Sequence, residues 1–68
     1  MAMKTTKICA GCYDRTDGRN VVTVVFHEHM KGWIAAATWD RHRYTDPIQT
    51  KREAILNADH MLESAEAF

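Results

Sequence analysis

The sequence predicts an α+β fold in which a small antiparallel sheet packs on one C-terminal α-helix. Two strand-like segments, 21–29 and 33–44, are joined by the turn Met30-Lys31-Gly32. A helix with a capping signal then begins near Thr50. This order is typical of a β-hairpin followed by a helix, and it occupies most of the 68 residues. We therefore expect a single domain over residues 1–68.

The segment before the hairpin is a candidate for a third strand. Residues 7–12 are long enough for a short strand and can pair with either edge of the hairpin, although Ile8 is the only strong strand former among them. Residues 13–20 are typical of a loop, because they contain the turn pair Asp17-Gly18.

Alternation along the hairpin predicts which side chains face the core. A two-residue turn at Lys31-Gly32 places Met30 opposite Trp33. One side is then apolar and is expected to be core; it carries Val22, Val24, Phe26, Met30, Trp33, Ala35, Ala37 and Trp39. The other side is mixed and carries Thr23, Val25, His27, His29, Ile34, Ala36, Thr38 and Asp40. A three-residue turn with Gly32 in a bulge is the alternative, and it shifts the pairing.

The helix is predicted from its cap and its period. Thr50 and Glu53 form a capping box. Apolar residues recur at helical spacing after it at Ile55, Ala58, Leu62 and Ala65, with Ala54, Met61 and Phe68 alongside. One face of the helix should therefore pack on the sheet. An earlier start, with Asp46 as the cap and Pro47 as the first residue, is the alternative.

Size and charge limit the possible functions. A chain of 68 residues has a small core, and nine of its apolar residues are alanines, so a stabilising partner is expected. Nine basic residues balance nine acidic ones, which leaves no long-range field to attract nucleic acid or a membrane. The start of the chain has no apolar run of the kind that signal peptides contain, so we expect a cytoplasmic protein without a membrane partner.

Two cysteines have the spacing of metal ligands. Cys9 and Cys12 have the Cys-x-x-Cys spacing of a zinc knuckle, and His27 and His29 lie on one side of a strand. A zinc-knuckle protein is therefore one alternative. The other is a pair of reduced, partly buried cysteines, and it is our expectation because only one knuckle is present. We predict no metal and no cofactor.

The sequence carries no recognisable catalytic motif. Ser64 is the only serine, and the chain has no Gly-rich phosphate loop, nucleophile elbow or metalloprotease motif. We therefore predict that the protein is not an enzyme.

Candidate partner-binding residues fall into two groups. Arg41, His42 and Arg43 follow the second strand-like segment, and Lys51 and Arg52 lie in the first helical turn, so the five side chains are a candidate basic patch. Basic residues at a helix start oppose the macrodipole, although a solvated cluster is the simpler interpretation. Trp33 and Ile34 lie beside the hairpin turn and are candidate apolar contacts.

The order of strand, turn, strand and then Thr50-Lys51-Arg52-Glu53-Ala54 resembles the C-terminal half of double-stranded RNA-binding domains. The resemblance covers residues 21–65 and implies that Lys51 and Arg52 contact RNA phosphates. The arrangement is also similar to small antitoxins of the HicB type. In size and compactness, the chain resembles the small proteins that phages encode to inhibit host or defence machinery, including anti-CRISPR proteins.

Together these observations predict a small non-catalytic binding protein that docks on a macromolecular partner and occludes it. A protein complex is the expected partner, and an RNA-binding module is the alternative. The sheet side with Val25, Ile34 and Ala36 is incompletely covered by a single helix, which favours a homodimer formed through the sheet.

Overall fold

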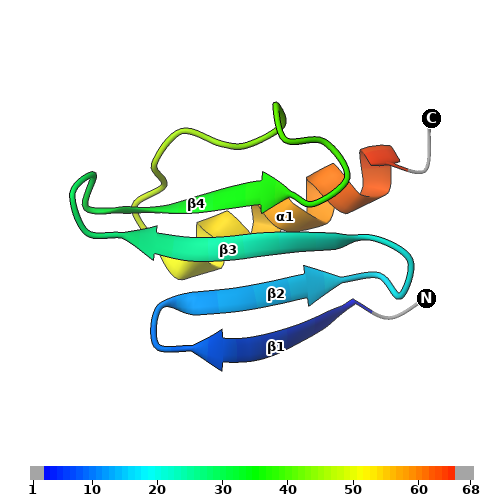
Figure 1. Cartoon of the computed structure of the whole chain (residues 1–68), viewed down its shortest axis with the longest axis horizontal. Helices are drawn as coiled ribbons and strands as arrows, with labels where there is room; N and C mark the ends of the chain where they lie inside the picture. The colour runs from blue at the N-terminus through cyan, green and yellow to red at the C-terminus, as the bar shows by residue number, and fades with distance from the viewer. Residues whose placement is uncertain (1–2, 66–68) are drawn as a thin grey trace.

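The computed structural model describes residues 3–65, which form one antiparallel sheet and one helix (Figure 1). The strands are β1 (Lys4–Cys9), β2 (Cys12–Thr16), β3 (Val21–His27) and β4 (Gly32–Ala37), and they lie in the order β1-β2-β3-β4. The helix α1 (Lys51–Ala65) follows a long connection. The predicted α+β class, with a β-hairpin sheet and one C-terminal helix, is confirmed.

The N-terminal part of the sheet is a hairpin of its own. β1 and β2 are joined by Ala10-Gly11, where Gly11 has a φ of 74°, and the pairing shifts at Ile8. Residues 7–12 are thus not one strand, and 13–16 are not a loop, because the turn lies in the middle of the segment assigned to a strand. β2 was not predicted as a strand because most of its residues are polar. It pairs with β3 on one side and with β1 on the other.

The second hairpin pairs Phe26 with Trp33 and His27 with Gly32. Its connection is therefore the four residues 28–31, with Lys31 at a φ of 51°, and the predicted opposition of Met30 and Trp33 is wrong. The residue opposite Trp33 is Phe26, four positions before the predicted Met30, so the pairing is shifted by an even number of residues. Because side chains alternate with a period of two, the residues of the paired strands still lie on the predicted sides of the hairpin.

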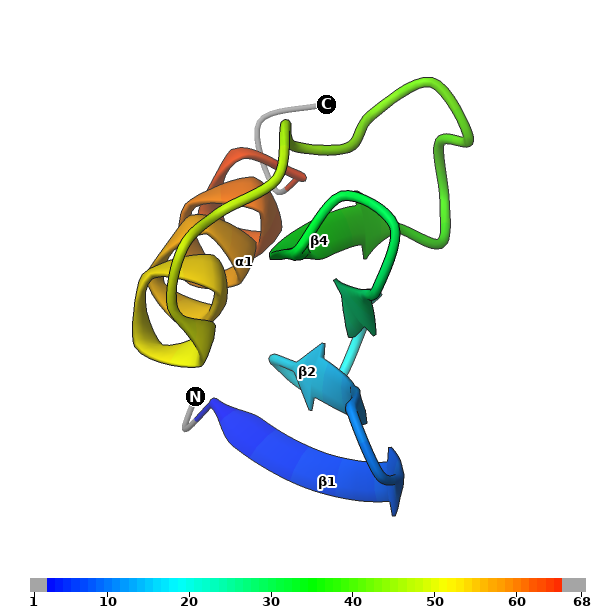
Figure 2. The same ribbon diagram turned by 90° about the vertical axis from the view of Figure 1, so that its left-hand side faces the viewer.

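The helix covers one face of the sheet, and within residues 3–65 no helix or strand covers the opposite face (Figure 2). α1 contacts β3 and β4 most and β2 least. The core between the two layers consists of Val22, Val24, Ala35 and Ala37 from the sheet and Ala54, Ala58, Met61 and Leu62 from the helix. Four of these eight side chains are alanines, which bury little area but let the helix lie close to the sheet.

The start of α1 agrees with the predicted cap. The side-chain oxygen of Thr50 accepts a hydrogen bond from the backbone N–H of Glu53 at 3.2 Å, so the alternative start at Asp46 is excluded. Along the predicted apolar face, Ala58 and Leu62 are buried, whereas Ile55 and Ala65 are half-buried. Ala54 and Met61, predicted beside this face, are also buried, and Phe68 lies outside the described residues.

The connection between β4 and α1 lies along the outer edge of β4. Ile48 exchanges two backbone hydrogen bonds with Trp33, at 2.7 and 2.8 Å, and Thr45 donates to the carbonyl of Ala35 at 3.0 Å. The expected strand 33–44 therefore ends at Ala37, and its remainder belongs to this connection. Within residues 3–65, nothing pairs with the outer edge of β1, whose six residues are all exposed.

Residues 3–65 contain no helix with the length and apolar character needed to cross a bilayer.

Candidate functional site

The exposed large apolar side chains gather at one end of the molecule. Six such side chains are exposed among residues 3–65, and four of them lie at or beside the turns 10–11 and 28–31, which share one end of the sheet (Figure 1, left). These four define the turn end: Ile8, Val25, Phe26 and Met30. The other two, Tyr44 and Leu56, lie in the long connection and on the helix. Phe26 lies on the helix side of the sheet and Val25 on the opposite face, so the turn end carries exposed apolar side chains on both faces. Exposed apolar side chains are usually scattered on monomers, so we take this end as the candidate contact surface.

Aromatic packing holds Phe26 in place. Its ring meets the ring of Trp33 edge to face, with centroids 5.4 Å apart, and Trp33 in turn packs on Tyr13 at 6.1 Å. The backbone N–H of Phe26 also donates to the carbonyl of Gly11 at 2.8 Å. Phe26 is nonetheless 40% exposed, so part of its ring is accessible to solvent while the rest packs on Trp33.

The five basic candidates do not form a single patch. Arg43 donates to the hydroxyl of Ser64 in the last turn of α1, whereas the ammonium of Lys51 lies 4.4 Å from the centre of the Tyr13 ring, at the first turn. The ends of a 15-residue helix are about 20 Å apart, so these two groups are separated by the length of α1. Arg41 and His42 are exposed before Arg43, and Arg52 is exposed beside Lys51.

The two apolar candidates lie on opposite faces of the sheet. Trp33 belongs to the aromatic packing on the helix side and is half-buried. Ile34 is also half-buried, and it lies opposite Val25 on the face that the helix does not cover. Trp33 therefore packs against Phe26 of the turn end. Ile34 extends the apolar surface around Val25 on the open face.

Sequence reasoning missed Phe26 and Met30 as surface residues because it assigned both to the core. Phe26 lies on the helix side of the sheet but is 40% exposed, and Met30 lies in the turn itself. The sequence did contain one signal for this exposure, because a single short helix cannot cover all the large side chains on the hairpin.

The cysteines and histidines lie near the same end. Cys9 and Cys12 are free and pair across the β1–β2 turn. His27 and His29 have ring centroids 6.1 Å apart, and the buried Nδ1 of His27 has no hydrogen-bond partner among the described residues. Among residues 3–65, no group of three or more His, Cys, Asp or Glu side chains converges to hold a metal, as the zinc-knuckle alternative would require.

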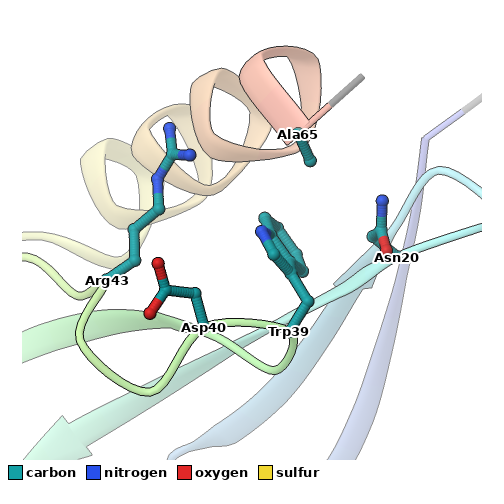
Figure 3. A pocket seen from close by; sticks show the side chains of 5 residues that line it. All are labelled: Asn20, Trp39, Asp40, Arg43 and Ala65. Atoms are coloured by element: carbon teal, nitrogen blue, oxygen red, sulfur yellow. The ribbon is translucent and has the colours of Figure 1, made fainter. Parts of the chain in front are cut away.

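A small pocket lies at the opposite end, near the C-terminus of α1 (Figure 3). Its volume is about 290 Å³, at the lower limit of ordinary ligand sites, and it is lined by Asn20, Trp39, Asp40, Arg43 and Ala65. The guanidinium of Arg43 is already bonded to Ser64. The lining thus offers one carboxylate beside an indole ring, without an adjacent acid–base or nucleophilic pair.

Comparison with known proteins gives no relative: no protein-family model, no curated protein and no solved structure matches the chain.

Proposed function

We propose that this chain is a small non-catalytic binding protein that docks on a protein partner through the turn end and occludes the surface beneath it. The observation that carries this proposal is the gathering of Ile8, Val25, Phe26 and Met30 at one end of the molecule. Apolar side chains that gather in one region of a surface often mark an interaction site, and burial against a partner removes their apolar area from water.

The surroundings of these side chains fit a protein interface. Glu28, His29 and Lys31 are exposed around Met30, so the apolar centre has a polar rim. The Trp33 ring behind Phe26 fixes the position of the exposed aromatic side chain, which lowers the entropy lost on binding. A rigid aromatic anchor inside a polar rim is typical of an interaction hot spot.

The proposal extends to the class of partner. Small phage-encoded inhibitors, including anti-CRISPR proteins, block a host or defence complex by covering one of its surfaces. The features that support this class are the small size of the chain and a compact scaffold whose apolar surface is concentrated at one end.

Comparative capture tests this proposal. The tagged chain is used to capture proteins from cells of its source, alongside Met30→Ser, Phe26→Ser and the control Leu56→Ser, which changes an exposed apolar side chain on the helix. We expect a defined complex with the wild type and Leu56→Ser, and at least about tenfold lower recovery with the two turn-end variants. Circular dichroism checks that each variant is folded. Equal recovery with all four proteins would contradict the proposal.

Duplex-RNA binding through Lys51 and Arg52 is the alternative function, and it has its own test. Lys51 lies on the Tyr13 ring at the helix start, and Arg52 is exposed beside it. If these groups bind phosphates, affinity must fall with salt, and Lys51→Ala with Arg52→Ala must reduce the slope by about one to two units. Absence of binding at low salt would eliminate this alternative.

A further inference from the structure

The two cysteines face each other across the tightest turn of the sheet. Cys9 ends β1, Cys12 begins β2, and the two residues are cross-strand partners. Only Ala10 and Gly11 separate them, and Gly11 takes the positive φ that closes the turn. The fold therefore holds two thiol-bearing residues together at an end of the sheet that is open to solvent.

This geometry is compatible with a disulfide. Facing residues of an antiparallel pair have Cα atoms about 4.5–5.5 Å apart, depending on whether the pair is hydrogen-bonded. Disulfides span Cα separations of about 4.4–6.8 Å. The Cα separation expected for such a pair thus lies within the range that a disulfide spans.

We infer that Cys9 and Cys12 are a redox-active pair, which cycles between a dithiol and an intramolecular disulfide by exchange with a low-molecular-weight disulfide such as oxidised glutathione.

The environments of the two thiols assign their roles. Cys9 is exposed, and a small disulfide can reach it directly. Cys12 is half-buried, and burial together with the neighbouring Cys9 and Asp14 raises the pKa of its thiol. Cys9 is therefore the attacking thiol and Cys12 the resolving thiol.

Exchange proceeds in two balanced steps. The Cys9 thiolate attacks one sulfur of oxidised glutathione, which forms a mixed disulfide and releases one glutathione thiolate. The Cys12 thiolate then attacks the sulfur of Cys9 and releases the second glutathione. The protein loses two electrons and two protons, and oxidised glutathione takes up both to become two glutathione thiols. Because Cys9 is exposed and the bond would close a ring of only four residues, reduced glutathione should reverse it readily.

A glutathione titration tests this inference. The full-length wild-type chain is equilibrated anaerobically with a series of reduced and oxidised glutathione ratios, quenched with acid, alkylated in denaturant and weighed by mass spectrometry. We expect the species with two alkyl groups to give way to a monomer without alkyl groups that has lost two hydrogen atoms. Cys9→Ser and Cys12→Ser are matched controls, and each should give only a single alkyl group or a single glutathione adduct.

The same titration in concentrated urea shows whether the fold promotes the bond. If the β1–β2 turn preorganises the thiols, the folded chain should reach half-oxidation at a severalfold lower proportion of oxidised glutathione than the unfolded chain. Two alkyl groups at every ratio, a disulfide found only between chains, or an equal or easier oxidation in urea would each overturn the inference.

Discussion

Arg15 on β2 and Asp59 on α1 form a two-point contact that ties the outer hairpin to the helix. Nε of Arg15 lies 2.7 Å from Oδ1 of Asp59, and Nη2 lies 3.2 Å from Oδ2. The same guanidinium donates to the hydroxyl of Thr5 on β1 at 2.8 Å. Since α1 does not itself contact β1, Arg15 is a link through which the edge strand is held to the rest of the fold.

Replacement of Arg15 by lysine should lower the free energy of unfolding by about 1 kcal/mol, because the charge remains but the fork geometry is lost. The side chains of Arg15 and Asp59 are only 18% and 22% exposed, so solvent screens this pair less than a surface pair. Urea unfolding of Arg15→Lys, Asp59→Asn and the double variant gives the coupling energy, with the exposed Arg52→Lys as control. A coupling indistinguishable from zero would show that the contact does not stabilise the fold.

Gly32→Ala should also destabilise the chain, by about 1–3 kcal/mol, because an added methyl group has no room. A Cβ at position 32 would lie 2.7 Å from Cβ of Pro47, in the connection that covers the edge of β4. Pro47→Gly removes the obstructing atom, so Gly32→Ala should cost less in that background. Chemical denaturation of the four proteins measures the difference, and equal costs in both backgrounds would refute this explanation.

Asp17 should make stability depend on acid pH. Its Oδ1 accepts the backbone N–H groups of Asn20 and Arg19, each at 2.9 Å, and these bonds lower the pKa of the carboxyl below its ordinary value. Stability from this group is present above the unfolded-state pKa of about 4 and is lost as the pH falls through the folded-state pKa.

Asp17→Asn retains an oxygen that can accept both bonds but does not titrate in this range. We therefore expect the variant to lose less thermal stability than the wild type between neutral pH and about pH 2.5, a range that spans the carboxyl pKa. Thermal melts followed by circular dichroism measure this difference. Parallel losses in the two proteins would show that other carboxyl groups cause the acid sensitivity.

Self-association through the open sheet face remains a prediction. Ile34 and Val25 are neighbours on that face, and the edge of β1 is unpaired among the described residues. Pairing of two copies would bury both features. We expect a homodimer at micromolar concentration, shifted towards monomer by Ile34→Asp but not by the helix control Leu56→Asp. Light scattering that gives a monomeric mass for the wild type at high concentration would reject the dimer.

The sequence predicted the elements with strong local signals. Thr50 and Glu53 located the start of the helix, and the alternation around Val22, Val24, Ala35 and Ala37 identified the core side of the central hairpin. The assignment of the core side is correct although the predicted turn was wrong. A shift of the pairing by an even number of residues keeps each side chain of the paired strands on the same face of the sheet.

The errors arose where the fold depends on distant contacts. β2 is polar and is a strand because it has partners on both sides, which no local pattern indicates. Likewise, the proposed basic patch depended on residues that α1 separates by its own length. Phe26 is exposed although its side of the hairpin faces the helix, and alternation along a strand cannot predict how far a helix covers that side.

Site-specific photocrosslinking in cells of the source tests the central proposal most directly. A photoreactive phenylalanine analogue is introduced at position 30, in the turn end, or at position 56, on the outer surface of α1, where Met30 and Leu56 are 55% and 53% exposed. Docking through the turn end predicts a discrete light-dependent adduct with a partner protein from position 30 and none from position 56. An adduct from position 56 alone, or none from position 30, would contradict the proposal.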